Sequence, residues 1–349
     1  MERTIYRIID ANFNRSREAC RLIEEFCRFV LNSRIFTDRA KKIRHELSST
    51  IGSLDSQILL ASRDTKGDVG AARIIDEQIK RNNIEDSFTA ACKRLGEALR
   101  VLAESLQSLD SEKSMVMERL RFAAYELEKD IVLFYKPKEK YKNVRLYVII
   151  TSDIPDEIIR LTKACAKNGA DCIQLRAKNI DSNTLFRTAC DFVKICKDNN
   201  VLSIINDRAD IAVACDADGV HIGLNDIPIE QVRKLQLKPL IIGCTTHSVS
   251  ELKNALEKTP TYVSLGPVFA TGTKPTLKPV GLDYVKQGTE LLIEAGTGHA
   301  AIGGITIENV SQVLKAGAQT IAICAAITKA DDPAEACRKF KQAVADFDK

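Results

Sequence analysis

Eight short apolar runs, separated by segments of helical length, are the feature that most restricts how this chain can fold. Each run is bounded by polar residues, which is typical of a buried strand. Eight strand–helix units in about 210 residues match the count and size of a (β/α)8 barrel, or TIM barrel. A doubly wound open sheet is the alternative architecture, but the even spacing of the units favours closure. The predicted strands cover residues 146–151, 172–177, 202–207, 219–223, 240–246, 262–269, 299–305 and 320–326.

The third predicted strand ends in a polar pair, Asn206 and Asp207, with a helix-like apolar run close behind it. An amide and a carboxylate at the end of a buried strand are costly unless they bind something. In an α/β barrel the carboxyl ends of the strands carry the chemistry. We therefore predict a functional role for Asp207, whereas we expect Asp210 to cap the following helix.

Polar groups also follow the other predicted strands, and together they predict an anion-binding site. Strand alternation places Gln174 and Arg176 on one face, pointing into the barrel mouth, with Lys178 just beyond them. The loop Thr271-Gly272-Thr273-Lys274 offers hydroxyls, backbone N–H groups and one positive charge to a phosphate. Gly303-Gly304, ahead of a predicted helix, would let backbone N–H groups approach a second phosphate.

Two carboxylates, Asp207 and Asp226, come from neighbouring predicted strands and would repel each other unless a cation lay between them. Two hard oxygen ligands together with phosphate oxygens describe Mg²⁺. His221, on an apolar strand, is either a core residue with satisfied hydrogen bonds or a participant in the site. No Ser-His-Asp triad is evident by spacing. The pattern thus indicates a site that binds and polarises a pyrophosphate, although each short motif alone is weak.

A change in the pattern of apolar residues along the sequence predicts the domain organisation. Residues 1–135 show apolar residues at helical spacing and almost no strand signal, which predicts an all-helical domain of uncertain role. Residues 136–143 are charged and contain a proline, so we interpret them as a linker. The barrel domain is then expected over residues 144–349.

The helical part contains a weak internal repeat. Arg15-x-x-Glu18-Ala19-x-Arg21-x-x-x-Glu25 recurs as Arg94-x-x-Glu97-Ala98-x-Arg100-x-x-x-Glu104. One interpretation is a solvated helix face with intrahelical ion pairs. The other is that the two helices face each other and build an arginine-rich pocket for a phosphorylated small molecule. The sequence does not decide between them.

Composition excludes several classes of protein. A net charge of +4 and the absence of tryptophan give no indication of nucleic-acid binding. No apolar run approaches the length of a membrane span, and the N-terminus has no signal-peptide core. The 11 cysteines form no Cys-x-x-Cys pair, so we expect reduced thiols in a cytoplasmic protein, with homo-oligomerisation possible. The four histidines lie far apart, which argues against a zinc site.

Residues from about 144 to 330 resemble the thiamine phosphate synthases, also called thiamine-phosphate pyrophosphorylases. The resemblance rests on a set of motifs that stand in barrel order. They are Gln174-Leu175-Arg176-x-Lys178, Asn206-Asp207-Arg208-x-Asp210-x-Ala212, Asp218-Gly219-Val220-His221-Ile222-Gly223-x-x-Asp226, Ile242-Gly243-x-Thr245-Thr246-His247-Ser248, Ser264-Leu265-Gly266-Pro267-Val268-Phe269-x-Thr271-x-Thr273-Lys274, Ala301-Ile302-Gly303-Gly304-Ile305 and Ala316-Gly317-Ala318.

The resemblance implies a reaction. A pyrimidine half and a thiazole half are joined into thiamine phosphate, and pyrophosphate is released. The pyrimidine half is 4-amino-5-hydroxymethyl-2-methylpyrimidine diphosphate. The thiazole half is 4-methyl-5-(2-phosphoethyl)thiazole or its carboxylated tautomer. The family mechanism is dissociative: pyrophosphate leaves, a pyrimidine carbocation forms, and the thiazole nitrogen captures it. Such a reaction needs charge stabilisation and no evident general base.

The resemblance also implies roles for individual residues. Asp207 and Asp226 match the Mg²⁺ ligands, and Arg176, Lys178 and Lys274 match the cations that act in catalysis. The matched substrate contacts are Gln174, Arg176, Lys178 and Asn206 for the pyrimidine diphosphate, Thr245 and Lys274 for its pyrophosphate, and Thr271, Thr273 and Gly304 for the thiazole phosphate.

Two departures from the family pattern stand out. Thr245 replaces the usual serine and keeps its hydroxyl. Cys324-Ala325 replaces a common Val-Ser pair, so the serine hydroxyl near a phosphate is missing here. The helical part resembles a domain that precedes the synthase in cyanobacterial-type enzymes, and its activity is not implied by the match. A thiazole tautomerase of the same barrel group and a non-catalytic thiamine-phosphate sensor are the alternative functions. Retention of both aspartates and of the threonine–lysine loop argues against them.

Overall fold

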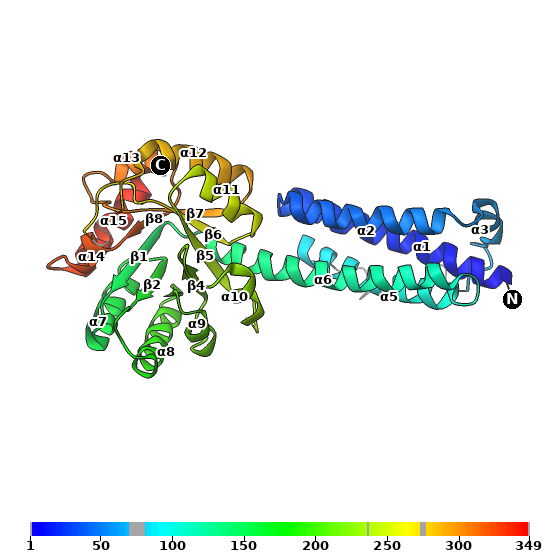
Figure 1. The fold of residues 1–349 in the computed structure, drawn as a ribbon, viewed down its shortest axis with the longest axis horizontal. Coiled ribbons are helices and arrows are strands. Elements are labelled where there is room, and N and C mark those ends of the chain that lie inside the picture. Colours follow the sequence, from blue (N-terminus) through cyan, green and yellow to red (C-terminus); the bar gives the residue numbers. More distant parts are fainter. Residues whose placement is uncertain (1, 70–80, 236, 273–276, 348–349) are drawn as a thin grey trace. The chain divides into compact units, whose positions relative to one another are not determined.

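The computed structural model describes residues 2–69, 81–235, 237–272 and 277–347. The chain divides into two compact units, Met1–Val132 and Leu133–Lys349. The first is helical and the second contains all eight strands that the structure describes (Figure 1). Within the described ranges, no helix is both long and apolar enough to cross a membrane.

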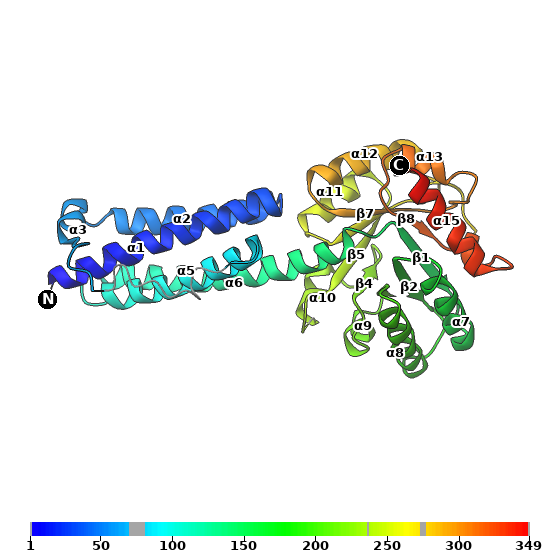
Figure 2. The same ribbon diagram turned by 180° about the vertical axis from the view of Figure 1, so that it is seen from behind.

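The eight strands form a closed parallel barrel in sequence order, and β8 pairs back onto β1 (Figures 1 and 2). The predicted barrel and the order of its strands are thereby confirmed. The last three strands end earlier than predicted, β6 because Gly266-Pro267 follows it and proline offers no N–H to a ladder. The strands are β1 Leu146–Thr151, β2 Cys172–Arg176, β3 Leu202–Asn206, β4 Gly219–Ile222, β5 Ile241–Thr246, β6 Tyr262–Leu265, β7 Gly298–Ile302 and β8 Ile321–Ile323.

Helices surround the barrel, and the two that follow β3 and β4 are short. Their apolar faces cover the outward side chains of the strands. The helices of this unit are α7 Pro155–Ala166, α8 Ser182–Asp198, α9 Ala209–Ala214, α10 Ile229–Leu235, α11 Val249–Glu257, α12 Gly281–Glu294, α13 Val310–Lys315, α14 Ala325–Thr328 and α15 Pro333–Phe347.

Strand alternation divides the core of this unit into two layers. In β1, Leu146, Val148 and Ile150 face outward into the larger cluster between strands and helices. Tyr147 and Ile149 face inward and fill the barrel together with Tyr262 and other inward side chains. This period of two is what a barrel strand requires, and it makes the inward positions of each strand the ones that reach the barrel mouth.

The helical unit is built from helices, three of which have starts that are capped by side chains. Ser33, Asp55 and Asn83 each accept a hydrogen bond from a backbone N–H in the first turn of the next helix. All regular elements described between residues 2 and 132 are helical, in agreement with the prediction. They are α1 Glu2–Glu25, the π-helical turn Phe26–Val30, α2 Arg34–Gly52, α3 Ser56–Ser62, α5 Ile84–Leu106 and the first part of α6 Ser111–Tyr141.

The predicted linker over residues 136–143 is wrong, because α6 continues as a helix to Tyr141. Pro137 lies inside this helix and removes one backbone hydrogen bond. Burial at helical spacing compensates for that loss: Phe134, Pro137 and Tyr141 are all buried, and the Tyr141 ring stacks on Tyr262 at a centroid distance of 4.3 Å. The high density of charge around these residues hid their apolar period in the sequence.

Candidate active site

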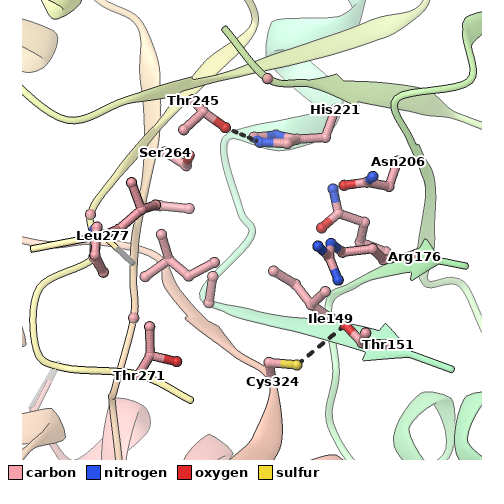
Figure 3. A pocket seen from close by; sticks show the side chains of 18 of the residues that line it. Ile149, Thr151, Arg176, Asn206, His221, Thr245, Ser264, Thr271, Leu277 and Cys324 are labelled. Carbon is pink, nitrogen blue, oxygen red and sulfur yellow. Dashed lines mark hydrogen bonds between the residues drawn. The ribbon is translucent and has the colours of Figure 1, made fainter. Parts of the chain in front are cut away.

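A cavity of about 820 Å³ opens where the carboxyl ends of the barrel strands meet. Figure 3 shows side chains from separate strands, including Arg176, Asn206, His221 and Thr245, arranged around it. The structure brings together nine of the residues singled out from the sequence: Gln174, Arg176, Lys178, Asn206, Asp207, Asp226, Thr245, Thr271 and Gly304. The remaining two, Thr273 and Lys274, lie outside the described residues.

Strand β2 supplies Gln174 and Arg176 to the cavity, as its alternation predicted. Gln174 is only 2% exposed, and its side-chain amide nitrogen has no hydrogen-bond partner among the described residues. A buried amide without a partner costs about 1–3 kcal/mol relative to a satisfied one. Such a donor on a cavity wall is well suited to bind an acceptor on a ligand.

The loop after β2 is held by the side chain of Asp153 from the loop after β1. Its carboxylate accepts hydrogen bonds from the backbone N–H groups of Lys178 at 2.7 Å and Asn179 at 3.0 Å. These bonds favour the charged carboxylate and lower the pKa of Asp153. The backbone of Lys178 is therefore fixed, while its exposed side chain reaches Asp207, with Nζ 3.5 Å from the carboxylate.

Asp207 and Asp226 form a close carboxylate pair. Burial and the neighbouring Asp226 carboxylate raise the pKa of Asp207, and the positive charge of Lys178 opposes that rise. Asp207 occupies the left-handed region of backbone conformation, at φ 62°, which a short polar side chain tolerates better than most. Asp226 is held in place because its carboxylate accepts the N–H of Gly223 at 2.7 Å.

This pair fits a hard divalent cation. Two carboxylates that raise each other's cost of ionisation, partly withdrawn from water and facing a cavity, have excess negative charge that an oxygen-seeking ion such as Mg²⁺ would neutralise. No group of three or more His, Cys, Asp or Glu side chains suited to a metal occurs in the parts of the chain that the structure describes. Most of the coordination shell would therefore have to come from water or from a bound substrate, as is usual for Mg²⁺.

The sequence left open whether His221 is a core residue with satisfied hydrogen bonds or a participant in the site, and the structure shows both features. Both ring nitrogens have hydrogen-bond partners, and the side chain lines the cavity. Its Nε2 lies 2.9 Å from the Thr245 hydroxyl, the contact drawn as a dashed line in Figure 3. Its Nδ1 lies 2.9 Å from the hydroxyl of Tyr262, which is itself 2.8 Å from the hydroxyl of Tyr147. Neither tyrosine is among the candidate residues predicted from the sequence, although each is a hydroxyl-bearing residue at an inward position of an apolar strand.

Across the cavity, Thr271 and the turn Gly303-Gly304 form the other wall. Both glycines have positive φ angles, and a Cβ on Gly304 would lie 2.5 Å from the carbonyl oxygen of Ala270, so only glycine fits there. The following helix, α13, begins at Val310, after a turn in which Asn309 accepts the N–H of Thr306. The backbone at Gly304 is therefore offered to the cavity by a turn and not by the first turn of a helix.

Two smaller expectations also have an outcome. Asp210 does not cap α9, whose N-cap residue is Arg208 with no side-chain hydrogen bond. Instead Asp210 pairs with Arg208 on the surface, with Nη2 2.6 Å from its carboxylate. Next to Ala325, where the family's hydroxyl is absent, the Cys324 thiol lies 3.5 Å from the Thr151 hydroxyl (Figure 3).

A second, charged cavity of about 680 Å³ lies within the helical unit, between α1 and α2. It is not formed by the two helices of the internal repeat. Intrahelical ion pairs are present in both copies, Arg21 with Glu25 at 2.9 Å and Arg100 with Glu104 at 2.6 Å, as the first interpretation expected. The described lining residues are Asn14, Arg17, Glu18, Arg21, Leu22, Glu25 and Arg44.

Comparison with known proteins identifies both parts of the chain. A family described as thiamine monophosphate synthase matches residues 146–327, and a family described as ThiD2 matches residues 7–130. Among solved structures, thiamine phosphate pyrophosphorylase from Pyrococcus furiosus superposes with a TM-score of 0.54 at 30% identity. That match covers 60% of this chain and 98% of the archaeal one.

Some relatives match this chain over nearly its whole length, including both the helical unit and the barrel. Thiamine-phosphate synthase of Thermosynechococcus vestitus is 34% identical, over 96% of this chain and 93% of its own. Thiamine-phosphate synthase of Rhodopirellula baltica is 36% identical, over 94% of this chain and 90% of its own. These matches extend over the barrel, its cavity and the helical unit alike. The chain therefore belongs to the thiamine monophosphate synthase family.

Proposed function

We propose that the barrel joins 4-amino-5-hydroxymethyl-2-methylpyrimidine diphosphate to 4-methyl-5-(2-phosphoethyl)thiazole, or its carboxylated tautomer, giving thiamine phosphate and pyrophosphate. The observation that carries this proposal is the convergence of a buried amide donor, Gln174, and a carboxylate pair, Asp207 and Asp226, on one cavity. Membership of the synthase family supports the same reaction. No membrane-spanning helix is found in the described residues, and we propose a cytoplasmic enzyme acting on small molecules.

In this proposal the pyrimidine half lies against β2 and β3. Gln174 donates its free amide hydrogens to the ring, and Asn206 lines the same wall. Arg176 and Lys178 neutralise the diphosphate, whose charge grows on the leaving group as the bond breaks. The Thr245 hydroxyl donates a hydrogen bond to the same group, and Lys274 supplies a further positive charge.

Asp207 and Asp226 would hold Mg²⁺ in this site. The ion would supply Lewis-acid stabilisation of the departing pyrophosphate. The contact between Lys178 and Asp207, at 3.5 Å, keeps the lysine beside that leaving group. The main requirement of the site is to neutralise negative charge on the leaving pyrophosphate, because a dissociative reaction builds this charge before the new bond forms.

The thiazole phosphate is proposed to bind on the opposite wall. Thr271 offers a hydroxyl, and the turn at Gly304 offers backbone N–H groups without a side chain in the way. The family resemblance adds Thr273, which lies outside the described residues. Holding both halves in one enclosed cavity places the thiazole nitrogen beside the reacting carbon and replaces a bimolecular encounter. No step requires a general base, and the His221 ring is engaged by Tyr262 and Thr245.

Two other functions fit this cavity less well. A thiazole tautomerase would have no use for a paired-aspartate site aimed at a pyrophosphate, and a thiamine-phosphate sensor would not need one. Both aspartates are retained, and both line the cavity. This geometry favours the synthase.

The test is formation of thiamine phosphate by the purified full chain supplied with both substrates and Mg²⁺. We expect product from the wild type, none after EDTA, and a loss of at least about 10²-fold in Asp207→Asn. Asp210→Asn is the matched control, because Asp210 lies three positions away and pairs only with Arg208 among its recorded ion pairs. A folded wild type that makes no product, or equal losses in the two variants, would overturn the proposal.

A further inference from the structure

Four side chains form a line of hydrogen bonds that leads from inside the barrel to the cavity wall. The Tyr147 and Tyr262 hydroxyls are 2.8 Å apart, Tyr262 is 2.9 Å from His221 Nδ1, and His221 Nε2 is 2.9 Å from Thr245 Oγ1. We call these four residues the relay. Its last member, Thr245, is a proposed pyrophosphate contact, and the two tyrosines have no role in the reaction as described so far.

The packing around Tyr262 fixes its ring in one position. Tyr262 is fully buried, and the ring of Tyr141 stacks on it with an interplanar angle of 4°. Gly243, on the neighbouring strand, leaves the space that the ring occupies, since a Cβ there would lie 2.1 Å from it. The Tyr262 hydroxyl is thus held against His221 and cannot swing away.

The protonation of the relay follows from burial. Desolvation raises the pKa values of Tyr147 and Tyr262 well above the usual range, so both hydroxyls keep their protons. Each hydroxyl then has one hydrogen to donate and lone pairs with which to accept. A neutral imidazole donates from one nitrogen and accepts at the other, so the arrangements in which every hydroxyl donates within the relay or to a ligand run in a single direction.

An anion in the cavity favours one of the two directions, and the Tyr262 hydroxyl, by donating to Nδ1, holds His221 in the tautomer that this direction needs. Thr245 can use its single hydroxyl hydrogen for His221 or for a phosphate oxygen, but not for both. A hydrogen bond to a charged acceptor is about twice as strong as a neutral one. Thr245 therefore donates to the anion and accepts from His221 Nε2–H, while Nδ1 accepts the Tyr262 hydroxyl, which in turn accepts that of Tyr147.

We propose that Tyr262 is a positioning residue: it holds His221 as the Nε2–H tautomer and so directs the Thr245 hydroxyl proton toward the leaving pyrophosphate. This inference rests on the proposed synthase function. Tyr262 does not touch the substrate, and its effect passes through His221 and Thr245. The relay makes Thr245 a prepared donor instead of a hydroxyl that must reorient as charge develops.

The first test is kinetic and uses the full chain. Tyr262→Phe keeps the buried ring and removes only the hydroxyl. We expect kcat for thiamine phosphate formation to fall about tenfold, with a smaller change in KM for the pyrimidine diphosphate, because the lost interaction strengthens as the pyrophosphate leaves. The matched control is Tyr141→Phe, which removes a hydroxyl from the stacked neighbouring ring and leaves the relay intact. It should retain wild-type kcat.

The second test distinguishes a directed relay from a merely structural tyrosine. In a Thr245→Val background, where the last acceptor is absent, adding Tyr262→Phe should lower kcat no further. Independent, multiplicative losses in the double variant would overturn the proposal, as would a Tyr262→Phe enzyme with wild-type kcat.

The third test reads the tautomer directly and needs no turnover. Nitrogen-15 spectra of the histidine side chains, with His221→Gln used for assignment, are recorded with Mg²⁺ and inorganic pyrophosphate. A protonated Nε2 and an unprotonated Nδ1 at His221, with this preference lost in Tyr262→Phe and kept in Tyr141→Phe, support the proposal. A protonated Nδ1 overturns it. If the wild type made no thiamine phosphate, the proposed function would fail, while these spectra would still decide the tautomer.

Discussion

Charged and polar side chains meet in one cavity in the barrel, whereas in the helical unit many of them pair with each other. Gln174, Asp207 and Asp226 stand far apart in the sequence and reach the same cavity because every strand of a parallel barrel ends on the same face. In α1 and α5, Arg21 and Arg100 each meet a glutamate four residues further along the same helix. Residues four positions apart on a helix thus form ion pairs that neutralise each other. In the barrel, the strand topology brings distant residues together into the candidate active site.

The two units also differ in how they treat buried polar groups. In the helical unit, Glu24 is buried but satisfied, since its carboxylate accepts from Arg44 Nε at 2.8 Å. In the barrel, the Gln174 amide nitrogen is buried without a partner. A buried donor left open on a cavity wall indicates binding, whereas a buried pair indicates structure. The following predictions test this contrast, from the largest expected effect to the smallest.

Gln174→Leu should separate activity from stability. We expect thiamine phosphate formation to fall roughly 10²-fold, because a site built to hydrogen-bond its substrate loses its donor. The free energy of unfolding should stay the same or rise by about 1 kcal/mol, since an unsatisfied buried amide is removed. Steady-state kinetics and denaturant unfolding on the same preparation measure both. A large loss of stability would show that Gln174 is structural and would break the contrast.

The barrel should lose stability in acid through His299. Burial lowers the pKa of His299 to about 4, and its Nε2 accepts the N–H of Gln319 at 2.9 Å. The unfolded chain takes up the proton near pH 6.5 and the folded chain does not, so stability is full above about 6.5 and falls as the pH drops toward 4. The expected loss is about 3 kcal/mol.

Unfolding free energies of wild type and His299→Gln, measured between pH 7 and pH 4, check this prediction. The variant should start lower at pH 7 and show a flatter pH dependence over this window. Parallel curves for the two proteins would assign the acid sensitivity to other groups.

Glu24→Gln should weaken the helical unit and leave catalysis alone. Removing one partner of a buried ion pair leaves the Arg44 guanidinium under-compensated, at a cost of about 1–3 kcal/mol. Hydrogen exchange in α1 and α2 should accelerate, while kcat for thiamine phosphate formation remains that of the wild type. A fall in kcat without faster exchange would give the helical unit a part in the barrel reaction.

Glu104→Gln should have the smallest effect. Its partner Arg100 is 55% exposed, and Arg100 also contacts Glu118 at 2.6 Å, so the helix keeps one ion pair. We expect a change in the free energy of unfolding within about 0.5 kcal/mol. Thermal unfolding of this variant beside Glu24→Gln compares an exposed pair with a buried one; equal effects would refute the role assigned to burial.

Much of the barrel was predictable because its information is local and periodic. Apolar runs ending in polar residues gave the eight strands, and alternation placed Gln174 and Arg176 on the inward face. The ends of β6 to β8 were less predictable, since the sequence continues to look extended after backbone pairing has stopped. The continuation of α6 was missed because the buried positions at Phe134, Pro137 and Tyr141 are separated by charged residues.

The part of the site that could not be predicted depends on contacts between distant strands. No local pattern indicates that Tyr147, at one end of the barrel sequence, meets Tyr262, or that Tyr262 meets His221. The space left by Gly243 becomes meaningful only when β5 and β6 are placed side by side. The first copy of the repeat contributes Glu18, Arg21 and Glu25 to the charged cavity of the helical unit, but the other wall comes from Arg44 on α2 and, among the described lining residues, not from the second copy.

The most direct test of the central claim is the dependence of thiamine phosphate formation on Mg²⁺ in wild type and Asp226→Asn. The account predicts product from the wild type at saturating Mg²⁺, and in the folded variant either no product or a requirement for at least about tenfold more Mg²⁺. Equal Mg²⁺ dependence in the two proteins, or no product from the folded wild type, would contradict it.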